Sequence, residues 1–232
     1  MQAQSAAEYR AAGVLFQSAN QERAARGLPA LRIDPALNTA ARQHAQRMAA
    51  EGTLSHQFPG EPALAARVAQ QGMAFSMVAE NVAEAPSAGH IQTEWMHSPP
   101  HRANLLDPRL DSIGLGVVGR DGELYAVEDL AHALRTLTRQ QQEQQVAAVL
   151  AAQGVAIQAK TAIARSYCGN APLRAHPLPR LIMNYTTTDL RQLPQLLQAR
   201  ITAGHARAAA VGACGLDNTG GFTAYHMIVL LY

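Results

Sequence analysis

The feature that most constrains the fold is an alternating apolar pattern near residue 115, followed by a glycine-rich turn. Ile113, Leu115 and Val117 alternate with glycines and a valine, the turn spans 119–122, and a second apolar run spans 124–127. Because side chains of a strand point alternately to the two faces of a sheet, this pattern predicts a β-hairpin. The hairpin follows a series of helical patterns, and that order indicates α+β layering.

Four helices are predicted before the hairpin. The second begins at Asp34, an N-cap residue that is followed by a proline at the first helical position, and it is closed by Gly52. Its apolar residues fall on one face together with His44, which is therefore expected to face the core. The predicted helical ranges are 6–26, 34–52, 61–71 and 87–97.

The sequence after residue 134 predicts a second, smaller α+β domain, so the expected domains are 1–134 and 135–232. The polar run 139–145 continues into an apolar stretch and predicts a helix up to Gly154. Segment 212–221 is interpreted as a hairpin connection, with a calcium loop as the alternative, although its acids are few. The remaining predicted elements are strands at 181–187, 206–213 and 222–232 and a helix at 193–201.

Composition limits the classes of function. The chain has 232 residues, of which 48% are hydrophobic and 16% charged, as in a globular protein. A net charge of +2 gives no argument for nucleic acid or an acidic membrane. No apolar run approaches the ~20 residues of a membrane span, and the N-terminal residues lack the pattern of a signal peptide. The two cysteines, Cys168 and Cys214, are predicted to form a disulfide, with two buried free thiols as the alternative.

Candidate functional residues lie in three short segments. The first contains His56, the second contains Glu80 and Asn81, and the third contains His101 and Arg102. Two imidazoles and a carboxylate are enough to hold a metal ion or to move a proton. A Gly-x-Ser-x-Gly elbow, a His-Glu-x-x-His motif and a phosphate-binding glycine loop are all absent from the sequence.

Other polar and aromatic residues near these segments receive structural interpretations. Trp95 is one helical turn from Ile91 and is expected in the core, while Asn104 is expected to cap or bridge loops. His90, His97 and His132 match no motif and are expected at the surface.

A series of short motifs occurs in a characteristic order along residues 10–130: Asn20 with Arg23, Leu28–Leu31, Leu37-Asn38, His44-Ala45, Met48-Ala49, Gly52–His56, Ala79–Ala83, Trp95–Leu106 and Ile113–Gly116. In this order and spacing, residues 10–130 resemble the CAP superfamily of cysteine-rich secretory proteins, venom antigens and plant pathogenesis-related proteins, and they are most similar to its bacterial members. The resemblance implies a three-layer α-β-α sandwich, a mostly secreted protein, and a cleft in which two histidines and two acids can bind a divalent metal. Matched by motif, three of these groups are His56, Glu80 and His101, and the second acid falls on Ser98.

The resemblance leads to a principal hypothesis and two alternatives. The principal one is a secreted or periplasmic binding protein whose cleft takes a divalent metal, such as zinc, or a small polar ligand, at His56, Glu80 and His101. Asn81 and Arg102 are expected in the same cleft, and Arg102 is expected to pair with Glu80. The alternatives are a metal-dependent, peptidase-like hydrolase with Glu80 as general base and a lipid- or sterol-binding protein. The C-terminal domain, for which no family is recognised, is expected to offer a surface to a protein or cell-envelope partner or to dock on the first domain.

Overall fold

The computed structural model describes residues 4–169, 172–173, 175–204 and 207–232. It forms two compact units, of which the first extends to Ala133 and also includes Gly220–Phe222, while the second comprises the rest of the chain from Leu134. The first unit contains α1 (Ala6–Ala24), β1 (Arg32–Ile33), α2 (Pro35–Glu51), α3 (Leu64–Gln70), β2 (Phe75–Ala85), α4 (Ala88–His97), α5 (Pro99–Leu105), β3 (Ser112–Arg120) and β4 (Glu123–Ala133).

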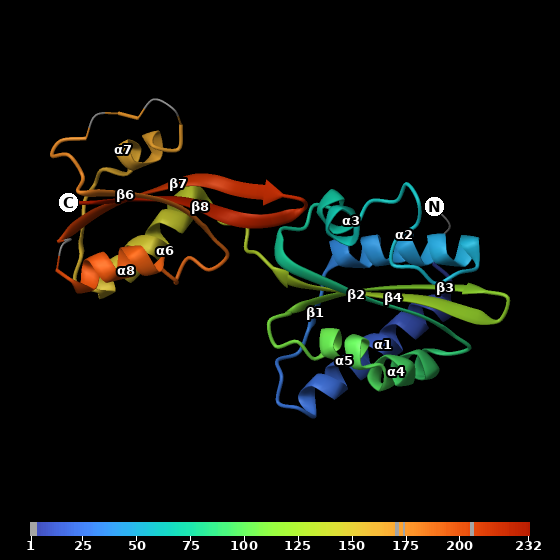
Figure 1. Ribbon diagram of the computed structural model, residues 1–232. Coiled ribbons are helices and arrows are strands. Elements are labelled where there is room, and N and C mark those ends of the chain that lie inside the picture. Colours follow the sequence, from blue (N-terminus) through green and yellow to red (C-terminus); the bar gives the residue numbers. More distant parts are fainter. Residues whose placement is uncertain (1–3, 170–171, 174, 205–206) are drawn as a thin grey trace. The chain divides into compact units, whose positions relative to one another are not determined.

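The first unit is the predicted three-layer α-β-α sandwich. Its sheet has the strand order β1-β3-β4-β2, and the predicted hairpin forms β3 and β4. β1 runs parallel to β3, while β2 and β3 are both antiparallel to β4. Helices α2 and α3 cover one face of the sheet, and α1, α4 and α5 cover the other (Figure 1).

Local signals place α2 where the sequence predicts it. The Asp34 carboxylate accepts hydrogen bonds from the backbone N–H groups of Ala36 and Leu37, Pro35 takes the first helical position, and Gly52 ends the helix with a φ of 66°. The close approach of α2 to β3 depends on glycine, because a Cβ at Gly116 would lie 2.3 Å from the backbone of Ala41.

Strand β2, which carries Glu80 and Asn81, was not predicted. Helices cover both faces of the sheet, so both faces of β2 are largely buried and the strand lacks a simple apolar–polar alternation. The predicted helix 61–71 begins later, at Leu64, because Glu61 belongs to the preceding loop. Helix α5 was also not predicted as a separate element.

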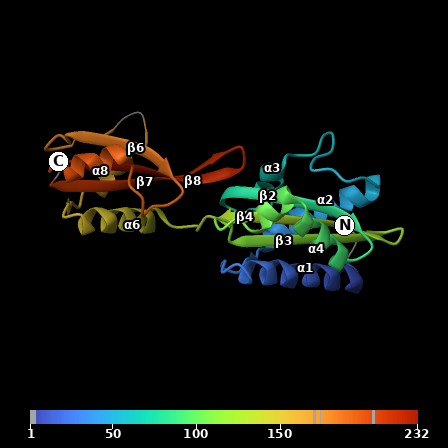
Figure 2. The ribbon, with the colours of Figure 1, turned by 60° about the horizontal axis from the view of Figure 1, so that its bottom comes forward.

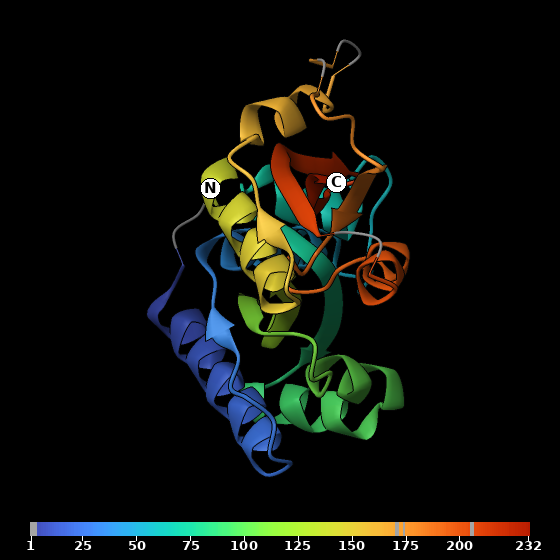
Figure 3. The same ribbon diagram turned by 90° about the vertical axis from the view of Figure 1, so that its left-hand side faces the viewer.

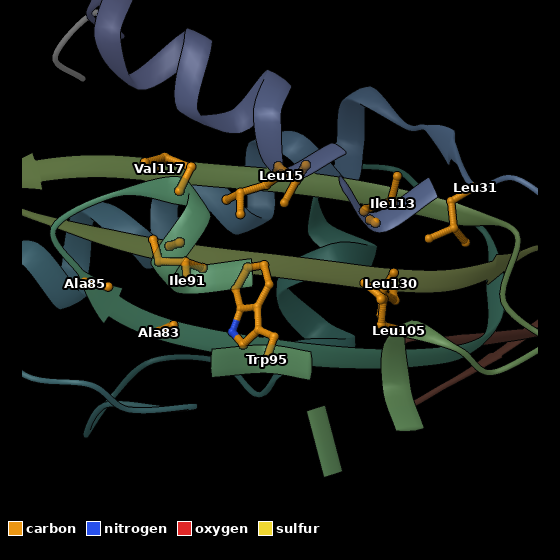
Figure 4. Packing of buried hydrophobic residues seen from close by; sticks show 14 of the residues in the cluster. Leu15, Leu31, Ala83, Ala85, Ile91, Trp95, Leu105, Ile113, Val117 and Leu130 are labelled. Atoms are coloured by element: carbon orange, nitrogen blue, oxygen red, sulfur yellow. The ribbon is translucent and has the colours of Figure 1, made fainter. Parts of the chain in front are cut away.

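The core beneath α1 and α4 includes the residues predicted from helical spacing. Trp95 and Ile91 of α4 are fully buried and belong to the same cluster as Leu15 of α1 and Leu130 of β4 (Figure 4). The interpretation of Trp95 as a core residue is therefore confirmed. On the opposite face of the sheet, His44 is buried as predicted.

The second unit contains α6 (Arg139–Ala152), β5 (Ala156–Ile157), α7 (Thr161–Ser166), β6 (Leu181–Thr187), α8 (Gln195–Thr202), β7 (Ala208–Thr219) and β8 (Phe222–Leu231). Helix α7 lies on one face of its sheet, while α6 and α8 lie on the other (Figures 1 and 3). The predicted disulfide between Cys168 and Cys214 is confirmed and links the segment after α7 to β7.

Strand β7 is longer than the sequence predicts. It extends to Thr219, so Asp217 is part of the strand and the connection to β8 is reduced to Gly220 and Gly221, both with positive φ (Figure 2). The interpretation of 212–221 as one long connection is therefore wrong. Residue 206, where this strand was predicted to begin, lies outside the described residues.

The two sheets share one topology, although the sequence shows no repeat. The order β5-β7-β8-β6 reproduces β1-β3-β4-β2, with the short first strand parallel to the third in each unit. The close helix-to-strand contact is repeated as well, since a Cβ at Gly212 of β7 would lie 2.5 Å from the backbone of Arg165 in α7. Each helix in the described part of the chain is too short or too polar to cross a membrane.

Candidate ligand-binding site

Glu80 is the centre of a polar network on the α2–α3 face of the first sheet. Its side chain is almost fully buried, and both of its oxygens are engaged. Oε1 lies 2.9 Å from Nδ1 of His56, and Oε2 accepts a hydrogen bond from Nη2 of Arg67 in α3. Arg67 also donates from Nη1 to the backbone carbonyl of His56, at 3.0 Å, and so fixes the loop that carries this histidine.

The expected pairing of Arg102 with Glu80 is wrong. The Arg102 side chain is exposed on α5 and donates to the carbonyl of Met96, whereas Arg67 takes the place beside the buried carboxylate. In the sequence, Arg67 lies in a segment that is predicted only to be helical, with no sign of a functional role for the arginine. The sequence signal for this pairing is weak, because the two partners are 13 residues apart on different elements.

A second histidine–carboxylate pair extends this network beneath the surface. Nδ1 of His44 lies 2.8 Å from Oε1 of Glu61, and Nε2 of His44 lies 2.7 Å from the carbonyl of Ser55. Glu61 also accepts a hydrogen bond from the backbone N–H of Phe58. The network therefore holds the loop between α2 and α3 from both of its ends, and Glu61 was not recognised from the sequence.

His56 and His101 are the imidazoles of the site that remain accessible. The His56 side chain is 61% exposed, and the hydrogen bond to Glu80 raises its pKa above the usual value. His101, in α5, is half-buried, and its pKa is lowered first by burial and then by the charge of nearby His56. The structure therefore pairs His56 directly with Glu80 and places His101 close enough to His56 for its charge to be felt.

Asn81 points to the opposite face of the sheet from Glu80, as expected for the next residue of a strand. Its Nδ2 donates to Oε2 of Glu128 on β4 and to the carbonyl of His101, at 2.8 and 3.0 Å. Asn104 donates to Oδ1 of Asn81 and to the carbonyl of Glu80, so it bridges elements as predicted. Asn81 thus positions α5 and its histidine from behind, rather than lining the accessible surface.

Two acids of β4 complete the buried network and were not found from the sequence. Glu128 is fully buried, and burial raises its pKa to about 8, although the Asn81 hydrogen bond and the charge of Arg23 oppose the shift. Asp129 lies directly opposite Glu80 in the strand register. Burial, followed by the charge of Glu80, raises the pKa of Asp129 well above its usual range.

The donor set fits a metal ion only in part. Within the described residues, no group of three or more histidine, cysteine or acidic side chains is arranged to hold a metal ion. Glu80 already has an arginine on one oxygen and a histidine on the other, which leaves the imidazoles of His56 and His101 as the available donors. Ser98 is the N-cap residue of α5 and supplies no carboxylate.

Residues 16–130 match the family described as the cysteine-rich secretory protein family, CAP. The match spans α1 to β4 and contains every residue of the site described above. This part of the chain is a CAP domain. The family predicted from the sequence motifs is therefore confirmed for the first unit.

The CAP domain has bacterial relatives, and this chain spans less than half the length of the two Bacillus proteins among them. The uncharacterized protein YkwD of Bacillus subtilis is 32% identical over 100 residues, which cover 43% of this chain and 39% of that protein. An extracellular SCP-domain protein of Bacillus anthracis has 24% identity and a TM-score of 0.50, and the match covers 53% of this chain and 41% of that one. An outer surface protein of Borrelia burgdorferi has 20% identity, the same TM-score and the same coverage of this chain, with 93% of its own chain covered. These structural matches support the CAP fold.

Proposed function

We propose that this protein acts outside the cytoplasm as a non-enzymatic binding protein, and that its CAP domain binds a ligand at His56 and His101. The CAP match and the description of the Bacillus anthracis neighbour as extracellular support this location. The disulfide agrees with it, since disulfides persist mainly in oxidising compartments.

The ligand we propose for this surface is a divalent metal ion such as zinc. Because Nδ1 of His56 faces Glu80, its Nε2 remains as a donor, and carboxylate-oriented imidazoles are common among zinc ligands. His101 would supply the second imidazole, and Glu80 would orient His56 rather than bind the ion itself. A bound ion would supply Lewis acidity and attach further ligand groups to the protein surface.

The engagement of both Glu80 oxygens is the observation that favours binding over hydrolysis. A general base needs a carboxylate oxygen that can reach a water molecule, yet Arg67 and His56 occupy the two oxygens of Glu80. Asp129, the neighbouring acid, is fully buried with its pKa raised, which favours the protonated form.

Calorimetric titration of zinc tests the proposal. We expect one weak site in the wild-type protein, no measurable site in His56→Ala or His101→Ala, and an unchanged site in His90→Ala, an exposed histidine of α4 outside the cluster. Ser98→Glu should raise the affinity if position 98 corresponds to the second acid of the family. Unchanged heats in both His56→Ala and His101→Ala would reject this site. Hydrolysis of a peptide or ester by the wild-type protein, abolished in Glu80→Gln, would instead support the hydrolase alternative.

A cavity favours lipid binding as the second candidate function. It has a volume of about 420 Å³ and is lined by residues of both α1 and α2. Its apolar lining includes Tyr9, Phe16, Ile33 and Leu115, and polar side chains of α2 complete it. This volume is within the range of small-molecule sites. The test is binding of a fluorescent fatty acid. Binding by the wild-type protein that is lost in Phe16→Trp, but kept in an exposed substitution such as Glu94→Gln, would support this function. No binding of the fatty acid by the wild-type protein would reject it.

A further inference from the structure

The small net charge of the whole chain conceals a strong difference between its two units. Residues 134–232 contain nine arginines and lysines but only three acids, which gives this part a net charge of +6 with neutral histidines. Residues 1–133 contain ten basic and fourteen acidic residues, a net charge of −4. An excess of positive charge within one compact unit favours an anionic ligand there.

Two of the three acids in the second unit are already paired. Arg165 forms two hydrogen bonds with Glu143, at 2.6 and 2.7 Å, and Arg191 pairs with Asp189. By contrast, the side chains of Arg180 and Arg200 contact no carboxylate among the residues that the structure describes. These two guanidinium groups therefore keep their full hydrogen-bonding capacity for a ligand.

Arg180 and Arg200 line the same cavity. It has a volume of about 160 Å³, and the other described residues that line it are Leu181 and Leu231. The backbone of Arg180 is fixed at the start of β6, where its N–H donates to the carbonyl of Leu231 at 2.7 Å. Arg200 comes from the last turn of α8. Among the described residues, two cations thus face a cavity whose other lining side chains are apolar and include no acid.

We propose that Arg180 and Arg200 form a phosphate-binding site, with Leu181 and Leu231 in contact with the carbon skeleton that carries the phosphate. A phosphate offers three or more oxygens to two planar guanidinium groups, whereas a carboxylate is satisfied by one. The ligand is a phosphoester, either soluble or in a lipid headgroup. The site is independent of the His56–His101 site, because it belongs wholly to the second unit.

The test is calorimetry of the full chain at low salt in a phosphate-free buffer, with phenyl phosphate as the probe and benzoate as its carboxylate counterpart. Arg180→Gln and Arg200→Gln should each weaken phenyl phosphate binding about tenfold, since each removes charge-assisted hydrogen bonds. Arg139→Gln is the matched control, because Arg139 is exposed on α6 outside the cavity and the charge change is the same. It should alter the affinity less than about twofold.

Vesicle sedimentation distinguishes the two sources of phosphate. The site would be assigned to a lipid headgroup if the protein cosediments with phosphatidic acid vesicles, but not with phosphatidylcholine vesicles, and if the double variant Arg180→Gln/Arg200→Gln loses this cosedimentation. Binding of phenyl phosphate without cosedimentation would assign it to a soluble phosphoester. The proposal is overturned if neither probe binds, if benzoate binds as tightly as phenyl phosphate, or if Arg139→Gln weakens binding as much as the cavity variants.

Discussion

Glu128 should destabilise the CAP domain at neutral pH, and Glu128→Gln should remove this cost. Burial raises the pKa of Glu128 from 4.5 to about 8, so the folded domain keeps its proton at pH 7 while the unfolded chain loses it. A folded pKa above the unfolded one means that stability falls as pH rises from 4.5 towards 8. Over the 2.5 pH units between 4.5 and 7 this costs about 3 kcal/mol, at roughly 1.4 kcal/mol per unit.

The substitution preserves the hydrogen bond that the structure shows. Nδ2 of Asn81 donates to Oε2 of Glu128, and the amide oxygen of glutamine can accept the same bond. Glu128→Gln should therefore match the wild type near pH 4.5 and exceed it by about 3 kcal/mol at pH 7. Glu94→Gln, the same change at an exposed position of α4, should alter stability by less than about 0.5 kcal/mol at either pH.

Urea unfolding followed by tryptophan fluorescence measures this difference directly. Trp95 is the single tryptophan of the chain and is fully buried in the CAP domain, so its emission reports the unfolding of this unit. The reasoning is refuted if Glu128→Gln is less stable than the wild type at pH 7, or if the difference between the two is the same at pH 4.5 and pH 7. Either result would mean that Glu128 is already ionised in the folded protein.

Three further predictions concern packing and pairing. Arg67→Ala should lower the free energy of unfolding by about 3–5 kcal/mol, because it leaves the buried Glu80 carboxylate without its cation. Arg102→Ala should change it by less than about 0.5 kcal/mol. Equal effects of the two variants in urea unfolding would contradict the pairing of Arg67 with Glu80. Gly116→Ala should lower the free energy of unfolding, measured in urea, by about 1–3 kcal/mol, because its Cβ would overlap α2. Gly119→Ala, with no neighbour closer than 3.7 Å, should be tolerated. The disulfide joins residues 46 positions apart, and its reduction should add the mass of two hydrogen atoms. Reduction should also lower the free energy of unfolding by about 4 kcal/mol, measured in urea by circular dichroism. An unchanged urea midpoint would contradict this.

Local chemistry explains the elements that the sequence predicts well. Asp34, Pro35 and Gly52 mark the ends of α2 through capping and backbone conformation, which depend only on near neighbours in the chain. The β3–β4 hairpin is predicted because its alternation and turn lie within one short segment. Strand β2 was missed because its burial depends on helices that are distant in the sequence and cover both of its faces.

The same distinction applies to the candidate site. The motifs of His56, Glu80 and His101 are visible in the sequence, and the structure pairs His56 with Glu80 and places His101 within electrostatic range of His56. The partner of Glu80 is not visible there, because Arg67 reaches it only through the packing of α3 against the sheet. The acids of β4 were missed for a similar reason, since only the strand register places Asp129 opposite Glu80 and Glu128 beside Asn81.

By itself, the sequence determined the CAP family of the first unit, its layers and the disulfide, and it indicated the histidines of the candidate site, because these follow from local motifs and their order. Only the tertiary structure decided which groups pair with Glu80, that the second unit repeats the strand order of the first, and that Arg180 and Arg200 meet at one cavity. These facts depend on contacts between residues that are far apart in the chain. Their energies come from burial and charge in three dimensions, which a linear pattern of residues does not contain.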